Sequence, residues 1–265
     1  MLCRDMVLNN MPDQNKGSEI KSVTTALNIL EVLKEHNGLR LTDVMEELNL
    51  AKTTAHRYLT TLEQNNYLIR QDSEYKISGR FIHYAEQVYN REPAYSMIGT
   101  KVENLAEETD ELVQFLIEEH HRIVYVFNEI GKQGIQIDTR AGQYGHLHST
   151  AGGKAILSEW SHEAVEQFCD DTDLPQITEH TITDPDELKA ELNEVRDAGY
   201  AVNDEENIVG VRAVAVPING PNGEVIGGIS ISGPINRIQG EVFRKELPDR
   251  LRGASNELEV NIRFH

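Results

Sequence analysis

The hydrophobic positions between residues 41 and 70 predict two short amphipathic helices joined by a tight turn. Asn49-Leu50 ends the first helix, and Ala51 to Thr54 opens the second with hydroxyl side chains suited to a helix N-terminus. This layout is that of a helix-turn-helix, in which the second helix enters the DNA major groove. The helical period is carried by Leu41, Val44, Met45, Leu48, Leu59 and Leu62.

The flanking segments extend this unit. Residues 22–33 form a preceding amphipathic helix, and residues 67–70 and 75–77 alternate like strands around a polar turn. A hairpin after a helix-turn-helix is a wing. A helix pair alone would also suit a small domain that only packs against another part of the protein. The order helix, helix, basic helix and hairpin favours DNA binding instead.

The second helix of this unit has an exposed face of cations and short hydroxyls. Such groups contact phosphates and base edges. We therefore expect the DNA-binding side chains to include one residue of the hairpin and six of the helix, namely Lys76 and Lys52, Thr53, Thr54, His56, Arg57 and Thr60.

Changes in pattern divide the chain into four segments. Residues 1–17 are polar and aperiodic, and we expect a disordered leader there. Residues 18–78 are the winged domain. Residues 79–92 predict a linker helix whose apolar and aromatic side chains suit a seam between two copies of the chain. From Pro93 the pattern becomes mixed, and residues 93–265 predict an effector-binding and oligomerisation domain.

The second part of the chain predicts an α+β domain. Its hydrophobic runs alternate between helical and strand periods, with Gly and Pro at the joints. Strands are expected over 111–118, 123–130, 211–218 and 224–232, and helices over 97–109, 151–157, 162–169, 185–198 and 244–262.

The net charge of −19 argues at first against DNA binding, but the charge is unevenly distributed. Residues 1–92 hold 11 Lys and Arg against 13 Asp and Glu, whereas residues 93–265 hold 14 against 31. The acidity therefore lies in the second part. A metal site, an acidic tail or adaptation to high salt could explain it. The acids are spread over helices and loops and lysine is scarce, which favours a halophilic protein.

Cysteine, histidine and hydropathy patterns exclude several classes of protein. Cys3 and Cys169 have no disulfide or metal spacing. No secretory signal or membrane-spanning run is present, so we expect a cytoplasmic protein without a membrane partner. His146 and His148 alternate and His120-His121 lie in a turn, but no carboxylate or cysteine completes a zinc spacing. We expect neither a metal nor a cofactor.

Two motifs suit a small-molecule pocket. Residues 148–154 place small side chains before a helix, where backbone N–H groups favour an anion. A glycine-rich loop needed only for turning is the alternative. Lys154 suggests phosphate, but the spacing of a nucleotide P-loop is absent. Ser230 and Ser232 share one strand face and could offer two hydroxyls to a ligand, unless that face is solvent-exposed.

Together, these segments resemble the IclR family of transcriptional regulators. The resemblance covers residues 22–262, and each motif is weak alone but the ordered set is specific. The matching segments are SVTTALNIL (22–30), LTDVMEELNLAKTTAHRYLTTLEQNNYL (41–68), YKISGRFIHYA (75–85), GHLHSTAGGKAIL (145–157), AGYAVNDEENIVGVRAVAVPI (198–218) and GGISISGP (227–234), followed by Asn236-Arg237.

The resemblance implies an N-terminal winged helix-turn-helix, a linker helix and a C-terminal GAF/PAS-like effector-binding domain. It maps the effector pocket to Ala151, Gly152, Asn203, Val211, Ala213, Ser230 and Ser232. Members that bind small keto acids can carry aspartate at the position of Asn203 and cysteine at that of Ala213. Both differ here, so we also consider sugar acids and aromatic acids among the small organic acids.

The leading hypothesis is a ligand-responsive regulator of a catabolic or metabolic operon, which is not an enzyme. It would bind a double-stranded DNA operator and a small-molecule effector as a homodimer or homotetramer. The effector would shift the population of two conformations. The alternative is a small-molecule enzyme built on the second domain, with the winged domain as an interaction module, although no nucleophile–base pair is recognisable.

Overall fold

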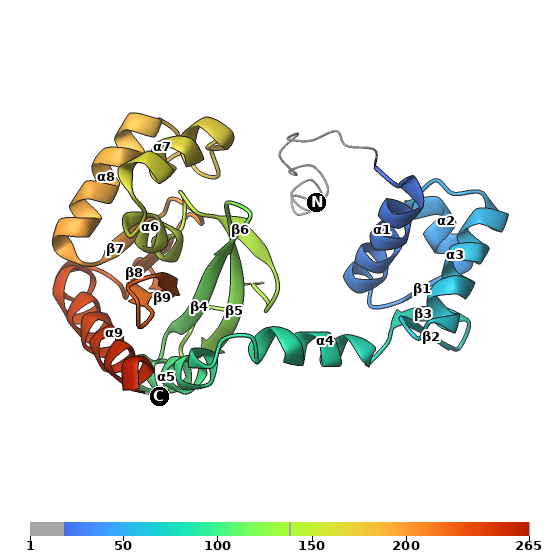
Figure 1. Cartoon of the computed structure of the whole chain (residues 1–265), viewed down its shortest axis with the longest axis horizontal. Helices are drawn as coiled ribbons and strands as arrows, with labels where there is room; N and C mark the ends of the chain where they lie inside the picture. Colours follow the sequence, from blue (N-terminus) through green and yellow to red (C-terminus); the bar gives the residue numbers. More distant parts are fainter. Residues whose placement is uncertain (1–18, 138, 265) are drawn as a thin grey trace. The chain divides into compact units, whose positions relative to one another are not determined.

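The computed structural model describes residues 19–137 and 139–264. The leader expected at residues 1–17 lies outside them. The chain divides into two compact units, the first ending at Glu92 and the second beginning at Pro93. The α-helices and β-strands of both are labelled in Figure 1.

The first unit is a helix-turn-helix followed by a hairpin. A positive φ of 50° at Asn49 makes the turn between its two central helices, and asparagine tolerates this conformation. The buried core consists of Ile29, Leu33, Val44, Leu59, Leu68 and Tyr75. Its elements are α1 (Lys21–Glu35), β1 (Leu39–Arg40), α2 (Leu41–Glu47), α3 (Lys52–Gln64), β2 (Leu68–Gln71), β3 (Glu74–Ile77) and α4 (Arg80–Tyr89).

The second unit is built on a six-stranded antiparallel sheet with the order β6-β5-β4-β9-β8-β7. Its elements are α5 (Ala94–Thr109), β4 (Leu112–Glu119), β5 (Arg122–Ile130), β6 (Tyr144–His146), α6 (Ala151–Ser158), α7 (His162–Asp171), α8 (Pro185–Ala198), β7 (Ala201–Asp204), β8 (Val211–Asn219), β9 (Val225–Pro234), a π-helical turn (Val242–Glu246) and α9 (Leu247–Phe264).

Helices cover both faces of this sheet (Figure 1). On one face, Phe115 of β4 packs edge-on against Tyr95 of α5, with ring centroids 5.6 Å apart. On the other face, the next residue, Leu116, joins a buried cluster with Ile156 of α6 and Phe168 of α7. The alternation of side chains along a strand thus sends neighbouring residues into two separate cores.

Three details of the second unit differ from the sequence-based expectations. The first helix begins at Ala94 instead of residue 97, directly after Pro93, whose fixed φ suits a helix start. The last helix begins at Leu247 because a π-helical turn occupies residues 242–246. The edge strands β6 and β7 are absent from the strands expected from alternation, because three and four residues are too few for a clear alternating pattern.

The glycines of residues 152–153 allow α6 to approach its neighbours closely. A Cβ built on Gly152 would lie 2.6 Å from the side chain of Leu116, and one on Gly153 would overlap the carbonyl oxygen of Leu147. Both glycines lie inside the first turn of α6, in agreement with the helix predicted over 151–157. Packing is therefore a sufficient reason for them.

We predict that Gly153→Ala destabilises the protein by about 1–3 kcal/mol, because the backbone of Leu147 must move to admit a methyl group. Gly253→Ala is the matched control. Gly253 is exposed in α9 with open space around its Cβ position, so alanine there should stabilise by up to about 1 kcal/mol. Urea unfolding of both variants tests this. Equal effects would show that α6 has room for a side chain.

Candidate functional site

The exposed face of α3 carries the predicted DNA-binding residues. Ala55 and Leu59 are buried on its opposite face, and the six helical candidates are therefore turned outward. The exposed members are Lys52, Thr53, His56 and Arg57, and the partly exposed members are Thr54 and Thr60. Ala51 is the N-cap, and no side chain caps this helix within the described residues, so the expected capping role of the hydroxyls is wrong.

The wing places two basic side chains beside its turn. Lys76 of β3 is partly buried; its stem lies against Gly38, and its Nζ is 3.9 Å from Glu74 Oε2. Arg70 of β2 is exposed, with its guanidinium 5.4 Å from the ring centroid of Tyr75. The sequence pattern did not single out Arg70, because a lone cation in an alternating strand carries no distinctive signal.

Polar contacts tie α4 to the end of α3. Arg80 donates to the carbonyl oxygen of Asn65 at 3.2 Å, and its guanidinium lies 5.0 Å from the ring centroid of Tyr67. The hydroxyls of Tyr67 and Tyr84 are 2.9 Å apart, and Ser78 Oγ donates to the Asn66 carbonyl at 2.6 Å. The helix is thus fastened to the winged domain near its own N-terminus.

The predicted effector residues of the sheet share one face. Asn203 pairs with Ala213, Ala213 pairs with Ser232, and Ala215 pairs with Ser230. Directly paired residues point to the same side, as do residues two apart on one strand, so Val211 belongs to this face too. Ala213 and Ala215 pack with Ala151 of α6. The face therefore lies under α6, and its serines are buried instead of solvent-exposed.

The N-terminus of α6 completes this group. Thr150 is the N-cap, and its Oγ1 accepts a hydrogen bond from Gly153 N at 3.1 Å. Ala151 and Gly152 occupy the first turn, where backbone N–H groups have no partner within the helix. Ser149 is fully buried, and its Oγ has no hydrogen-bond partner among the described residues. An unpaired buried hydroxyl beside free amides suits a polar ligand atom.

Asn203 joins two of the segments that carry these residues. Its Nδ2 donates to the Ser149 carbonyl at 2.5 Å, and its Oδ1 accepts from the backbone N–H of Glu206 at 3.1 Å. The side-chain amide of Asn203, a predicted effector-binding residue, therefore holds two backbone segments together. Its observed role is to position Ser149.

Gln114 is a polar residue of the sheet face that the sequence analysis missed. It lies on β4 directly opposite Ser230 and is buried. Its Nε2 donates to Asn128 Oδ1 at 2.7 Å and to Thr139 Oγ1 at 2.9 Å, which fixes the orientation of the amide. A glutamine inside the apolar run LVQFLI was the available signal.

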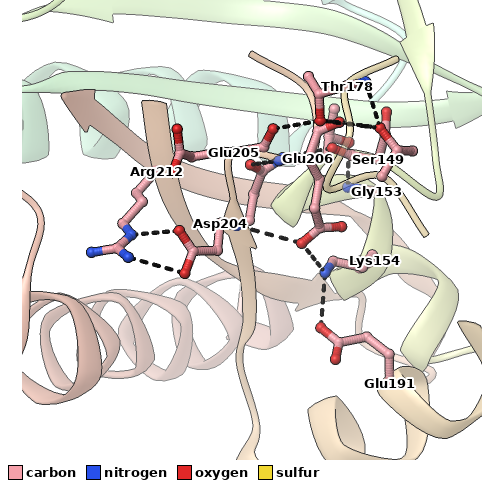
Figure 2. A network of polar contacts seen from close by, with 12 residues as sticks. Ser149, Gly153, Lys154, Thr178, Glu191, Asp204, Glu205, Glu206 and Arg212 are labelled. Atoms are coloured by element: carbon pink, nitrogen blue, oxygen red, sulfur yellow. Dashed lines mark hydrogen bonds and ion pairs between the residues drawn. The ribbon is translucent and has the colours of Figure 1, made fainter. Parts of the chain in front are cut away.

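Lys154 lies at the centre of a buried ionic cluster (Figure 2). Its side chain is fully buried, and Nζ donates to Glu206 Oε1 at 2.7 Å and to Glu191 Oε1 at 2.8 Å. Burial raises the pKa of Glu206, while the Lys154 ammonium acts in the opposite direction. The ammonium is thus paired with two carboxylates, which disfavours the phosphate contact that its sequence context suggested.

His146 and His148 lie together, with ring centroids 5.6 Å apart. Burial lowers the pKa of His148 to about 4, so it is neutral at physiological pH. Its Nε2 carries the proton, because its partner at 3.1 Å is the Pro175 carbonyl, which can only accept. Among the described residues, no group of three or more histidine, cysteine or acidic side chains is arranged to hold a metal ion.

Within residues 19–137 and 139–264, every helix is too short or too polar to span a bilayer.

Comparisons with known proteins all point to the IclR family of transcriptional regulators. The family model "Bacterial transcriptional regulator IclR C-terminal" matches residues 87–260, and the IclR helix-turn-helix domain matches residues 22–72. The chain is 30% identical over 259 residues to the probable HTH-type transcriptional regulator ArcR of Halobacterium salinarum, covering 95% of this chain and 98% of ArcR.

Solved structures give the same result. The crystal structure of the Thermotoga maritima IclR is similar with a TM-score of 0.80 and 29% identity, covering 92% of this chain and all of that one. An IclR homolog from Microbacterium hydrocarbonoxydans, complexed with 4-hydroxybenzoate, has a TM-score of 0.77 and 21% identity, covering 92% and 99% of the two chains. The second likeness is evidence for the fold alone.

We predict that His148 lowers stability in mild acid. Its pKa is about 4 in the folded chain and ordinarily 6.5. As the pH falls from 6.5 to 4, the unfolded chain takes up a proton that the folded chain does not, so stability is lost. At about 1.4 kcal/mol per pKa unit, the total is about 3 kcal/mol.

His148→Gln should therefore flatten the dependence of the free energy of unfolding on pH between 6.5 and 4. His83→Gln, at an exposed position of α4, is the matched control and should keep the wild-type slope. Chemical unfolding at a series of pH values measures both. An unchanged slope in His148→Gln would contradict a buried neutral histidine.

Proposed function

Because the chain belongs to the IclR family of transcriptional regulators, we propose that it controls a catabolic or metabolic operon in response to a small organic effector. Residues 18–78 would bind the operator, 79–92 would link the domains, and 93–265 would bind the effector and join the copies. The proposal rests on the exposed face of α3, the second helix of the helix-turn-helix, which presents cationic and hydroxyl side chains.

On DNA, α3 would lie in the major groove with its N-terminal half against the base edges. Arg57 is the side chain best suited to read a base, because a guanidinium can contact guanine with two hydrogen bonds. Lys52 and the threonines near the helix start would contact phosphates. Arg70 and Lys76 would bring the wing to the neighbouring backbone.

The effector would lie between the N-terminus of α6 and the sheet face that carries Ser230 and Ser232. Free amides of the first turn favour a carboxylate, and the serines can bond hydroxyl groups. Lys154 is already paired with two carboxylates, so the anion would depend on helix amides. A small organic acid, sugar acid or aromatic acid fits this chemistry, and the 4-hydroxybenzoate complex of the Microbacterium homolog supports the aromatic case.

A homodimer or homotetramer would place two winged domains on two half-sites. The exposed apolar side chains Ile82, Tyr84 and Val88 of α4 support contact with a second copy. We further infer a cytoplasmic, halophilic protein. The charge of −19 and the likeness to a Halobacterium regulator support adaptation to high salt.

We predict that Arg57→Ala weakens operator binding by about 1–3 kcal/mol, or roughly 5- to 150-fold in Kd. Arg57 is exposed, so the fold should be unaffected. Lys34→Ala, which removes a cation at the end of α1, is the control and should bind like the wild type. Gel shifts at matched salt with the DNA upstream of the chain's own gene measure the affinities. Wild-type binding by Arg57→Ala would reject this assignment.

We predict that Ser230→Ala combined with Ser232→Ala weakens effector binding roughly tenfold, because each hydroxyl contributes about 0.5–1.5 kcal/mol. A thermal-shift screen of central-carbon, sugar and aromatic acids would first identify a stabilising ligand. Titration of that ligand then compares the double variant with Ser96→Ala, which changes an exposed serine of α5. Equal affinity in all three proteins would place the ligand elsewhere, while operator binding should stay normal throughout.

A further inference from the structure

Gln114 belongs to the sheet face that α6 covers. It pairs with Ser230 of β9, and Ser230 pairs in turn with Ala215 of β8. Directly paired residues point to the same side of a sheet, so the Gln114 side chain lies beside that of Ser230. Ala215 packs with Ala151 in the first turn of α6. The glutamine amide is therefore a neighbour of the groups that form the proposed effector site.

The first turn of α6 contacts the sheet close to Gln114. A Cβ built on Gly152 would lie 2.6 Å from the Leu116 side chain, and one built on Gly228 would lie 3.0 Å from the Gly152 carbonyl oxygen. Leu116 and Gly228 are paired, and each lies two residues from the pair of Gln114 and Ser230. Two residues of a strand span about 7 Å. A small acid whose carboxylate lies at the α6 amides is therefore long enough to contact Gln114 with its other end.

The hydrogen bonds of the Gln114 amide leave its carbonyl oxygen available. A glutamine amide has two N–H donors. Nε2 donates to Asn128 Oδ1 and to Thr139 Oγ1, so both donors are used. Oε1 has no hydrogen-bond partner among the described residues, although Gln114 is only 5% exposed. A buried acceptor of this kind suits a donor on a ligand.

Ser149 supplies a second buried polar group without a partner, at the residue before the N-cap of α6. It is fully buried, and its Oγ has no hydrogen-bond partner within the described part of the chain. A serine hydroxyl can donate or accept, whereas the oxygen of an amide can only accept. The ligand atom at Gln114 must therefore carry a hydrogen. A hydroxyl group meets this requirement, and a keto oxygen does not.

We propose that Gln114 selects effectors that carry a hydroxyl group in addition to their carboxylate. The carboxylate lies at the amides of the α6 N-terminus, and the hydroxyl donates to Gln114 Oε1. The inference rests on the proposed effector site and narrows its ligands to hydroxy acids, which include sugar acids and hydroxylated aromatic acids. Keto acids and acids without a hydroxyl are disfavoured, because they leave the glutamine oxygen without a donor.

Isothermal titration of the full chain tests this proposal with pairs of acids that differ in their hydroxyl groups. The pairs are 4-hydroxybenzoate with benzoate, D-gluconate with hexanoate and D-glycerate with propionate. In at least one pair, the hydroxy acid should bind the wild type roughly tenfold more tightly than its partner, which is the effect of one hydrogen bond.

Gln114→Met keeps the length of the side chain and removes the acceptor. The hydroxy acid should then lose its advantage, while the affinity for its partner should change little. A purely structural role would weaken both acids of a pair alike and leave the ratio of their Kd values unchanged. Gln167→Met makes the same change at an exposed position of α7 and should keep the wild-type ratio.

Thr139→Val gives an independent test that remains available if Gln114→Met does not fold. It removes one of the two acceptors that hold Nε2, so the amide is free to turn. The preference for the hydroxy acid should fall in this variant as well.

The proposal is overturned if no hydroxy acid of the three pairs binds the wild type, if the acids without a hydroxyl bind as tightly, or if the folded variants at Gln114 and Thr139 keep the wild-type ratio. Gel shifts with the operator separate this result from the proposed function. A hydroxyl preference that is lost in Gln114→Met supports the role of Gln114 even where the acid leaves operator affinity unchanged, and that outcome would reject the regulatory response alone.

Discussion

The ammonium of Lys154 is the constraint on which the second domain depends. A charge fully removed from water is tolerable only if ionic partners and hydrogen bonds replace its hydration. Its partners come from two other segments, Glu191 of α8 and Glu206 after β7. The three segments must therefore meet at one point. Replacing Lys154 alone would leave the buried Glu206 carboxylate without its cation, so the helix, its neighbour and the loop are fixed together.

The same loop organises the ligand-binding candidates. From Glu206, one backbone N–H reaches Asn203, and the Asn203 amide reaches the carbonyl of Ser149. The hydroxyls of Thr178 and Thr181 donate to the carbonyls of Glu205 and Glu206, at 2.8 and 2.6 Å. The loop is thus held from three sides. Ser149, at the proposed effector site, is tied to this loop through Asn203, so a ligand there would act on a rigid connection.

Features that depend on neighbours in the sequence were predictable. The helix-turn-helix follows from local amphipathic periods, and the common face of Ser230 and Ser232 follows from strand alternation. The partners of Lys154 lie 37 and 52 residues away, and no local pattern relates them. For the same reason the sequence left open whether the glycines at 152–153 served a ligand or a turn. In the structure they pack against Leu116 and Leu147, which only the fold brings near.

The proposed response also requires a connection between effector and operator. In the first unit, Arg80 and Tyr84 fasten the start of α4 to Asn65 and Tyr67, immediately after α3. These contacts would couple a rotation of α4 to α3. The boundary between the two units, at Glu92 and Pro93, falls in the short segment between α4 and α5. In the proposed dimer, an effector that favours one arrangement of the units would alter the spacing of the two α3 helices. Operator affinity would change with it, because half-site recognition is sensitive to that distance.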